Sequence, residues 1–390
     1  MGCRGMAEGV QCWLRIGCNR RSGEWEPRID GEGDGRDAIA VDDPWGISVV
    51  IPCWEAHGTL AAAVRSALEQ TVEVREVLVV DDGSTPPVRS ADLPEDPRVR
   101  LMQRPHSGQV IARNAGLIEA RGRWLAFLDA DDLWHPRKLE IQLAVFDRHP
   151  EAGAVVTSGR VYTGGDQAVS EAWDGAGMDL KATVQAAYPL ALRDLARANL
   201  VLKSSVLIAR EVMDVVGLPD PVMRGVEDWE YWLRVIRRFP ILCVEHPLVL
   251  RLERSTGVSH RLSTAAKCRL TRSVFDRHQS FLLEGLGPAG LMAAKACWNA
   301  FFGIRFLIFE NDTRAARRLL ISAWAHHPNR WSLWRPWVAS WLPVWLRRRV
   351  SDTYQRPDKR KAAGVGGVRT QGRVRIQATA RGEIEGPRSG

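Results

Sequence analysis

The chain has 390 residues, of which 45% are hydrophobic and 26% charged, a balance typical of a globular protein and not of a disordered, collagen-like or disulfide-built chain. The formal net charge is +8, but residues 1–44 are acidic, with 6 Lys and Arg against 9 Asp and Glu, and residues 351–390 are basic, with 9 against 4. Glycine is concentrated in the same two ends. We therefore expect 1–44 and 351–390 to be disordered extensions on either side of the fold.

Cysteine usage and hydropathy indicate a cellular compartment. Seven cysteines without dense spacing argue against a disulfide framework and favour a reducing environment. The first thirty residues contain no apolar run suited to a signal peptide. Lys295, Arg305 and Glu310 interrupt the best candidate for a spanning helix, so none is expected. These features predict a cytoplasmic protein.

The first predicted elements alternate between strand and helix. Residues 47–51 (Ile-Ser-Val-Val-Ile), followed by Pro52, have the pattern of a short buried strand. Apolar residues recur at helical spacing over 60–68, and a second strand is predicted over 76–80. This order predicts parallel strands joined by a right-handed crossover. The alternation continues with a strand over 99–103, a helix over 110–120 and a strand over 124–128.

The next part of the chain is less regular. Residues 160–200 contain Gly, Asp and Ser with little periodicity and predict a loop-rich region with one helix near 190–198. The remaining predicted elements are a helix over 138–147, a strand from 154, a strand over 201–208, helices over 210–216 and 227–237, strands over 241–244 and 248–252, and a mostly helical region over 261–350.

Carboxylates follow two of the predicted strands where each strand ends. Asp81 and Asp82 follow the strand over 76–80, and the run Asp129-Ala130-Asp131-Asp132 follows the strand over 124–128. In an open α/β sheet this edge is where ligands bind. An Asp-Xaa-Asp pair there suits a divalent cation that shares its other positions with water and phosphate. Two ordinary explanations stay open: the second run could cap a helix after Leu133, and the first could be a plain turn.

The residues also resemble a known family. Five blocks carry the resemblance: Ser48-Val-Val-Ile-Pro-Cys-Trp54, Val80-Asp-Asp-Gly-Ser84, Arg113-Asn114-Ala-Gly116, Phe127-Leu-Asp-Ala-Asp-Asp132 and Glu227-Asp228-Trp229. Their order and approximate spacing are similar to those of family 2 glycosyltransferases. The resemblance implies an α/β protein of the GT-A fold over 45–260, with a Rossmann-like, mostly parallel sheet that binds a nucleotide sugar. A helical Trp-rich extension over 261–350 would follow it.

The resemblance also implies a donor site. Its members are Pro52 and Trp54 at the nucleoside, Asp81 and Asp82 at the base, and Arg113 and Asn114 at the phosphates and ribose. A UDP-sugar is the favoured donor. However, Pro52-Cys53-Trp54-Glu55 stands where the family usually has Pro-Xaa-Tyr-Asn, so the identity of the base stays open.

For the reaction, the resemblance implies inverting transfer assisted by Mg²⁺ or Mn²⁺. Asp131 would bind the metal, and Asp129 would face the sugar or ribose. Asp228 occupies the place of the catalytic base, with Glu227 the adjacent candidate. Many relatives have a metal-binding His near the end of the domain, where this chain has Glu253, which could ligate a hard cation instead.

Tryptophans recur at helical spacing near the end of the extension. They are Trp331, Trp334, Trp337, Trp341 and Trp345, with arginines at the margins. Such a face is typical of a helix that lies in the plane of a membrane, which would suit a lipid-linked acceptor. The segment 330–349 is therefore a candidate for peripheral membrane contact. The alternative is a helical hairpin whose tryptophans cover the catalytic domain.

Three other functions are alternatives for this sequence. A processive membrane synthase should carry a Gln-Xaa-Xaa-Arg-Trp motif soon after the Glu227-Asp228 pair, and this chain has none there. The pI of about 9.4 and the basic tail suggest nucleic-acid binding, but no aromatic residue follows Tyr354 in that tail, so no nucleic-acid partner is expected. A catalytically inactive, sugar- or nucleotide-binding relative is the third alternative. The favoured function is transfer of a sugar to a glycan or lipid-linked acceptor.

Overall fold

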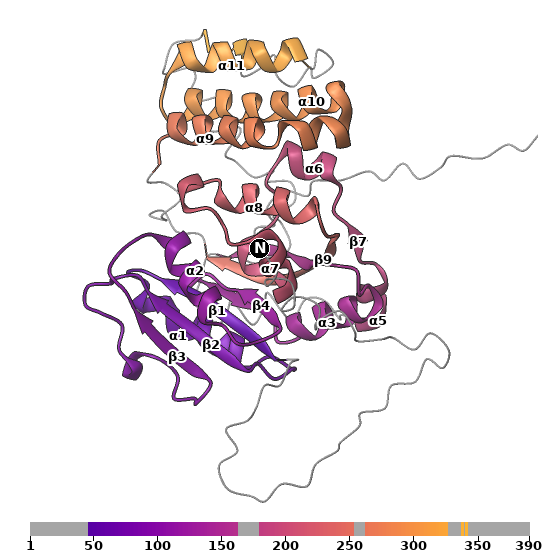
Figure 1. Ribbon diagram of the computed structural model, residues 1–390. Coiled ribbons are helices and arrows are strands. Elements are labelled where there is room, and N and C mark those ends of the chain that lie inside the picture. Colours follow the sequence, from indigo (N-terminus) through magenta and orange to yellow (C-terminus); the bar gives the residue numbers. More distant parts are fainter. Residues whose placement is uncertain (1–45, 163–178, 253–261, 327–336, 339, 342–390) are drawn as a thin grey trace, which may run out of the picture. The chain divides into compact units, whose positions relative to one another are not determined.

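The computed structural model describes residues 46–162, 179–252, 262–326, 337–338 and 340–341 (Figure 1). The predictions for 1–44 and 351–390, for Glu253 and for most of 330–349 therefore lie outside the described residues. Within the described part, one sheet has the strand order β3-β2-β1-β4-β8-β6-β9-β5, and β7 also pairs with β9. The strands are β1 Ile47–Cys53, β2 Glu76–Asp81, β3 Val99–Gln103, β4 Trp124–Phe127, β5 Asp132–Trp134, β6 Ala154–Tyr162, β7 Tyr188–Pro189, β8 Leu207–Ala209 and β9 Ile241–Leu252.

Strands β3, β2, β1 and β4 form the parallel half of the sheet. Every residue of β1 and β2 is buried, as expected for strands with both faces covered. Pro52 pairs with Val80 and Cys53 with Asp81, so β1 and β2 end at the same edge. The predicted order of parallel strands and crossover helices is confirmed here.

The other half of the sheet is mixed. Strand β8 runs antiparallel to β4 and β6, whereas β6 and β9 form a long parallel pair. The two strands predicted over 241–252 are a single strand, because β9 continues past a register shift at Ser158 of its partner. The strand predicted over 201–208 is wrong in its first part, where the 3₁₀ turn η2 (Lys203–Ser205) precedes β8.

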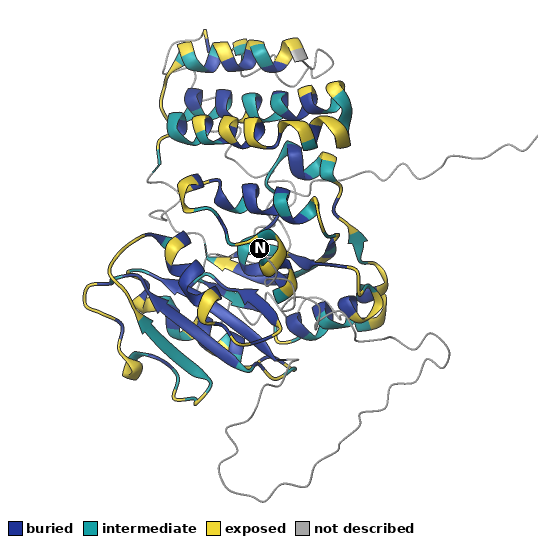
Figure 2. Cartoon of the chain, in the orientation of Figure 1, coloured by how far each residue is buried: buried dark blue, intermediate teal, exposed yellow. Residues whose placement is uncertain are grey.

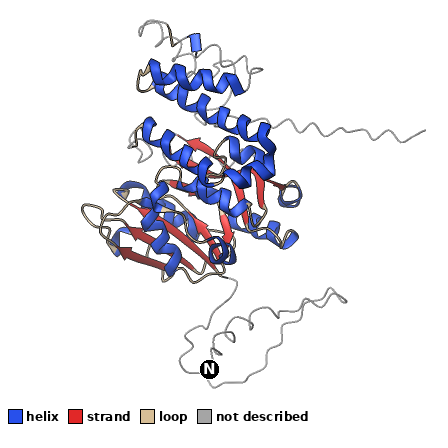
Figure 3. Cartoon of the chain, turned by 45° about the horizontal axis from the view of Figure 1, so that its top comes forward, coloured by secondary structure: helices blue, strands red, loops and turns tan. Residues whose placement is uncertain are grey.

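Helices cover both faces of the sheet, and their buried sides face it (Figure 2). One core cluster joins the sheet to helices α1 and α3, and the second joins it to α2, α6, α7, α8, α9 and α10. The helices are α1 His57–Leu68, α2 Gln109–Glu119, α3 Lys138–Arg148, α5 Leu180–Gln185, α6 Leu192–Arg197, α7 Arg210–Val216, α8 Glu227–Ile236, α9 Thr264–Arg277, α10 Gln279–Ile308 and α11 Thr313–His326, with 3₁₀ turns η1 Ser90–Asp92 and η3 Pro221–Met223. The expected α/β fold with a helical C-terminal part is confirmed (Figure 3).

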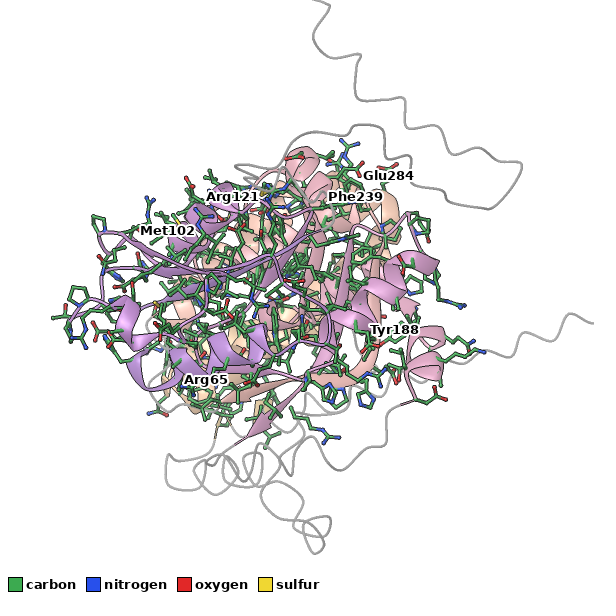
Figure 4. All side chains as sticks on the ribbon, turned by 90° about the horizontal axis from the view of Figure 1, so that it is seen from below. Arg65, Met102, Arg121, Tyr188, Phe239 and Glu284 are labelled. Carbon is green, nitrogen blue, oxygen red and sulfur yellow. The ribbon has the colours of Figure 1, made fainter. Side chains whose placement is uncertain are left out.

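The C-terminal helices share a core with the sheet. Phe275 of α9 and Leu282 of α10 belong to the same buried cluster as Phe127 of β4. The indole of Trp298 on α10 donates a hydrogen bond to the carbonyl of Ala196, 3.0 Å away, and its ring lies 4.6 Å from that of Trp229 on α8. Seen from below, side chains fill the interior of the described part of the chain (Figure 4). Helices α9 and α10 therefore help to fix α8.

Helix α10 is the one described helix long and apolar enough to span a membrane. The sequence had predicted no helix that could span a membrane, so α10 differs from that prediction in length and composition. Half of its most apolar window is buried against other parts of the chain, and the core helix of a globular protein meets the same criterion. Ala294 and Phe302 are among its buried residues.

Candidate active site

The carboxyl ends of β1, β2 and β4 bring the predicted donor residues to one edge of the sheet. Trp54 follows β1, Asp82 follows β2, and Asp129 lies two residues after β4. The amide of Asp82 donates to the carbonyl of Cys53 at 2.9 Å, and the amide of Leu128 donates to that of Val50 at 3.1 Å. Parallel pairing therefore extends to this edge. Pro52 itself is buried within β1.

Asp81 and Asp82 are both buried and accept hydrogen bonds from loop backbone. The Asp81 carboxylate accepts from the amides of Ser84 and Val88, each at 3.0 Å. The Asp82 carboxylate accepts from the amides of Ser107 and Gly108, each at 2.8 Å. The bonds to Asp81 hold the turn after β2, and the bonds to Asp82 hold the segment that leads into α2. The plain turn that the sequence left open as an alternative is therefore present at Asp81. A direct contact of either carboxylate with a base stays a prediction.

Trp54 lies beside a residue that the sequence did not single out. Its ring is 5.0 Å from the ring of His106, tilted by 36°. Asp82 holds His106 in place, because Nδ1 of the ring lies 2.9 Å from the carbonyl oxygen of Asp82 and 3.0 Å from its Oδ2. Gly83 has φ +75°, and a Cβ there would lie 2.7 Å from the amide nitrogen of His106. Two aromatic rings thus stand together where the nucleoside is expected.

Arg113 and Asp129 form a partly buried ion pair at this edge. The Nη2 of Arg113 donates to Oδ1 of Asp129 at 2.8 Å, and Gln109 donates to the same oxygen at 3.1 Å. The Arg113 side chain is buried, and its Nε has no hydrogen-bond partner among the described residues. A buried N–H group without a hydrogen-bond partner costs free energy, so this guanidinium is suited to binding an anionic ligand.

Asn114 has a different place from Arg113. Its Nδ2 donates to the carbonyl of Pro219 at 2.8 Å, which ties α2 to the segment before α8. Its Oδ1 is buried without a hydrogen-bond partner among the described residues. The predicted contact of Asn114 with phosphate or ribose stays a prediction.

The Asp129–Asp132 turn concentrates negative charge. Asp131 is half-buried, and Asp132 is buried at the start of β5. The hydroxyl of Ser204 donates to Oδ2 of Asp132 and accepts from the amide of Asp129 at 3.0 Å. Burial, together with the charges of Asp129 and Asp131, raises the pKa of Asp132 well above its usual range. The idea that these aspartates cap a helix after Leu133 is wrong, because β5 follows and α3 begins at Lys138.

The carboxylate oxygens of the Asp129–Asp132 turn are ligands that suit Mg²⁺ or Mn²⁺. Among the described residues, no group of three or more His, Cys, Asp and Glu side chains is arranged to hold a metal ion. Glu253 lies outside those residues. The carboxylates of this turn fit a cation that takes one or two ligands from the protein and its other ligands from a diphosphate and water, which is the usual arrangement for Mg²⁺.

Glu227 and Asp228 lie in the first turn of α8 and differ in exposure. The Glu227 side chain is 5% exposed and the Asp228 side chain 19%. Both oxygens of Glu227 are engaged: Oε1 lies 3.0 Å from Nζ of Lys203, and Oε2 accepts from the amide of Gly225. In Asp228, Oδ1 accepts from the amide of Trp229 at 2.8 Å, and Oδ2 lies 3.9 Å from Nζ of Lys203. Asp228 is thus the more open of the two carboxylates.

These surroundings raise the pKa of Asp228 and lower the pKa of Glu227. Burial raises the pKa of Asp228, and the negative charge of Glu227 adds to this, although Lys203 opposes both effects. Burial would also raise the pKa of Glu227, but the charge and hydrogen bond of Lys203 outweigh it and lower that pKa. Asp228 is therefore the better proton acceptor of the pair.

Lys203 and Ser204 were missed in the sequence. Lys203 contacts the Glu227–Asp228 pair, and Ser204 contacts the Asp129–Asp132 turn, so η2 links the two sets of acids. The available signal was the polar triplet Lys203-Ser204-Ser205 inside an otherwise apolar run. A buried strand would not carry three polar residues in succession.

Comparison with known proteins gives the following matches. Residues 48–186 match the family model described as Glycosyl transferase family 2. The chain is 37% identical over 105 residues to an uncharacterized glycosyltransferase of Rickettsia conorii, covering 26% of this chain and 17% of that protein. It is 38% identical over 105 residues to the Escherichia coli UDP-Glc:alpha-D-GlcNAc-diphosphoundecaprenol beta-1,3-glucosyltransferase WfgD, covering 26% of this chain and 42% of WfgD. The alignments thus span less than half of the length of these relatives.

A longer alignment joins the chain to the putative teichuronic acid biosynthesis glycosyltransferase TuaG of Bacillus subtilis, with 29% identity over 198 residues, 49% of this chain and 72% of TuaG. Among solved structures, residues 1–349 of S. aureus TarS in complex with UDP match with a TM-score of 0.42 and 14% identity, covering 84% of this chain and 96% of that chain.

Proposed function

The chain belongs to the family 2 glycosyltransferases, and on that premise we propose that it transfers a hexose, with inversion, from a nucleoside diphosphate sugar to an acceptor hydroxyl. One observation carries the proposal. The 3₁₀ turn η2 contacts both the Asp129–Asp132 turn, where a donor diphosphate would bind, and the partly exposed carboxylate of Asp228. A proton acceptor and an anion site thus lie on either side of one short turn.

In the proposed reaction, Asp228 accepts the proton of the acceptor hydroxyl as that oxygen attacks the anomeric carbon opposite the leaving nucleotide. Glu227 is occupied by Lys203 and Gly225 and does not compete for this role. Arg113 has a buried donor left to stabilise the negative charge of the leaving diphosphate. A Mg²⁺ or Mn²⁺ ion held by Asp131 would neutralise further charge on that group. No covalent intermediate is needed.

The nucleotide is proposed to be uridine diphosphate. The name of the WfgD relative specifies UDP-Glc as its donor, and Trp54 and His106 supply two rings against which a flat base could stack. The acceptor is proposed to be a glycan or a lipid-linked sugar, since WfgD is named for a diphosphoundecaprenol-linked acceptor and TuaG for teichuronic acid biosynthesis.

The proposed compartment is the cytoplasm, with peripheral contact at the inner face of the membrane through the C-terminal part of the chain. The four described cysteines are free thiols, which agrees with a reducing environment. Several large apolar side chains of the C-terminal helices are exposed, among them Phe309 and Trp324. Such side chains beside arginines suit a membrane surface.

A donor panel tests the proposal. Purified protein is incubated with UDP-, dTDP-, GDP- and ADP-hexoses, with Mn²⁺ or with a chelator, and nucleotide release is measured. We expect release from one UDP-hexose that requires the metal and increases with a lipid-linked or glycan acceptor. Release from none of the donors, together with no calorimetric binding of any nucleoside diphosphate, would reject the proposed function.

A further inference from the structure

The most unusual charged group near the proposed base is Lys203. We propose that Lys203 is a positioning residue, which binds Glu227 as its counter-ion and thereby assigns the role of base to Asp228. This inference rests on the proposed function, because it explains which of two adjacent carboxylates takes the proton.

The geometry of Lys203 is asymmetric. Its Nζ lies 3.0 Å from Oε1 of Glu227 and 3.9 Å from Oδ2 of Asp228. The shorter contact is a hydrogen bond, and with the amide of Gly225 on its other oxygen it leaves Glu227 without an unoccupied oxygen. The longer contact is electrostatic only. Asp228 also accepts a side-chain hydrogen bond from Asn199, but its side chain is 19% exposed, against 5% for Glu227, so a substrate hydroxyl has better access to Asp228.

The charged groups around this ammonium come from four elements. Glu227 and Asp228 of α8 and Asp129 of the turn after β4 attract it, and Arg113 of α2 repels it. Lys267 on α9 also interacts electrostatically with Glu227. Three acids against one opposing cation raise the pKa of Lys203, although burial acts against this, so the ammonium stays charged at neutral pH.

The ammonium of Lys203 offsets the repulsion between the carboxylates of Glu227 and Asp228. Two buried neighbouring carboxylates without a cation would repel each other, and one of them would take up a proton. Because Lys203 binds Glu227 more closely, Glu227 stays ionised and Asp228 keeps the higher pKa of the two. The ammonium also opposes the rise in the pKa of Asp228 that burial and the charge of Glu227 cause.

Lys203 also links the base to the donor side of the site. The next residue, Ser204, is hydrogen-bonded to the amide of Asp129 and to the carboxylate of Asp132. Its carbonyl accepts from the indole of Trp134, 2.7 Å away. The backbone of η2 is therefore fixed from the donor side, while its lysine reaches the base.

The test compares Lys203→Met with Lys203→Arg through the pH dependence of kcat. Removing the cation should raise the pKa of Asp228, so we expect the acid limb of the Lys203→Met profile to move to higher pH by about one unit or more. The affinity for UDP, measured by calorimetry, should stay within threefold of that of the parent, because the donor contacts are unchanged. Lys203→Arg keeps the charge and should keep the parental acid limb.

A second variant covers the case in which Lys203→Met does not fold. In Lys203→Met/Glu227→Gln both charges of the pair are removed, and with them the repulsion of Asp228, so the acid limb should return toward that of the parent. A parental acid limb in folded Lys203→Met, or a double variant whose limb is shifted by a unit or more, would overturn the assignment of Lys203. A parent protein that releases nucleotide from no donor would instead reject the proposed function.

Discussion

His278 and Glu230 meet in the interior, with Nε2 of the imidazole 3.1 Å from Oε1 of the carboxylate. Burial alone would raise the pKa of Glu230, but the hydrogen bonds from His278 and Arg234 lower it to about 2. The carboxylate is therefore ionised and can only accept, so the ring N–H of His278 donates. This contact joins α8, which carries Asp228, to the junction of α9 and α10.

The first prediction concerns Glu230→Gln. A carboxyl whose pKa is lowered in the folded state stabilises the protein above its unfolded pKa, and this stabilisation is lost as the pH falls through the folded value. We expect Glu230→Gln to lower the free energy of unfolding at pH 7 by about 2–3 kcal/mol. The difference from the parent should narrow below about pH 4.5 and disappear near pH 2. Urea unfolding at several pH values measures it. A difference that is the same at every pH would contradict the ionic role of Glu230.

The second prediction separates the two acids at the start of α8. Asp228→Asn keeps the shape of the side chain and should preserve the fold and the affinity for UDP, but turnover should fall by about 10² to 10⁴, the usual contribution of a general base. Glu227→Gln is the matched control, in which we expect a smaller loss of turnover because Asp228 is still present. Nucleotide release in the presence of acceptor measures both. If Asp228→Asn transfers sugar within threefold of the parental rate, the base is not Asp228 and Glu227 becomes the candidate.

The regular elements of the catalytic part could be predicted because their signals are local. Strand β1 and helix α8 show apolar periodicity within their own residues. Strand β5 was missed because it has three residues and owes its existence to pairing with β9, more than a hundred residues later in the chain. The turn η2 was hidden by the apolar residues on either side of it, Leu202 and Val206.

The candidate site also combines residues that the sequence marks with residues that it does not. The acids could be found from the sequence, because family motifs and strand ends mark them. Their partners could not, since each lies far away in the chain: Lys203 is 24 residues from Glu227, and Ser204 is 72 residues from Asp132. Which carboxylate stays open is decided by these partners. The resemblance alone favoured Asp228 over Glu227, and the structure adds that Asp228 is the more exposed of the two side chains.

The third prediction concerns the proposed metal. Asp131→Ala should lower the affinity for UDP in the presence of Mn²⁺ by at least tenfold, about 1.4 kcal/mol. A chelator should weaken the parent by a similar factor and add little to the effect of the substitution. Asp147→Ala, at an exposed position on α3, is the matched control and should bind as the parent does. Calorimetric affinities that are equal with and without Mn²⁺ would count against a metal at Asp131.

The last prediction concerns the surface of the C-terminal helices, where exposed apolar side chains lie near arginines. Ile321 and Trp324 are exposed on α11, and the guanidinium of Arg317 on the same helix lies 3.5 Å from the ring centre of Trp341. Apolar side chains can enter the headgroup region, and arginines attract anionic lipids. We expect the protein to float with phosphatidylcholine vesicles that contain phosphatidylglycerol, less with vesicles that lack it, and less at high salt.

Ile321→Ser/Trp324→Ser should weaken this flotation severalfold while leaving nucleotide release from a soluble donor and acceptor unchanged, because the change removes apolar area outside the site. Val215→Ser, on α7, removes an exposed apolar side chain elsewhere and serves as the control. A parent that does not float with either vesicle, or a double variant that floats as well as the parent, would show that this surface does not bind the membrane. The C-terminal helices would then serve the enzyme only through their packing against α8.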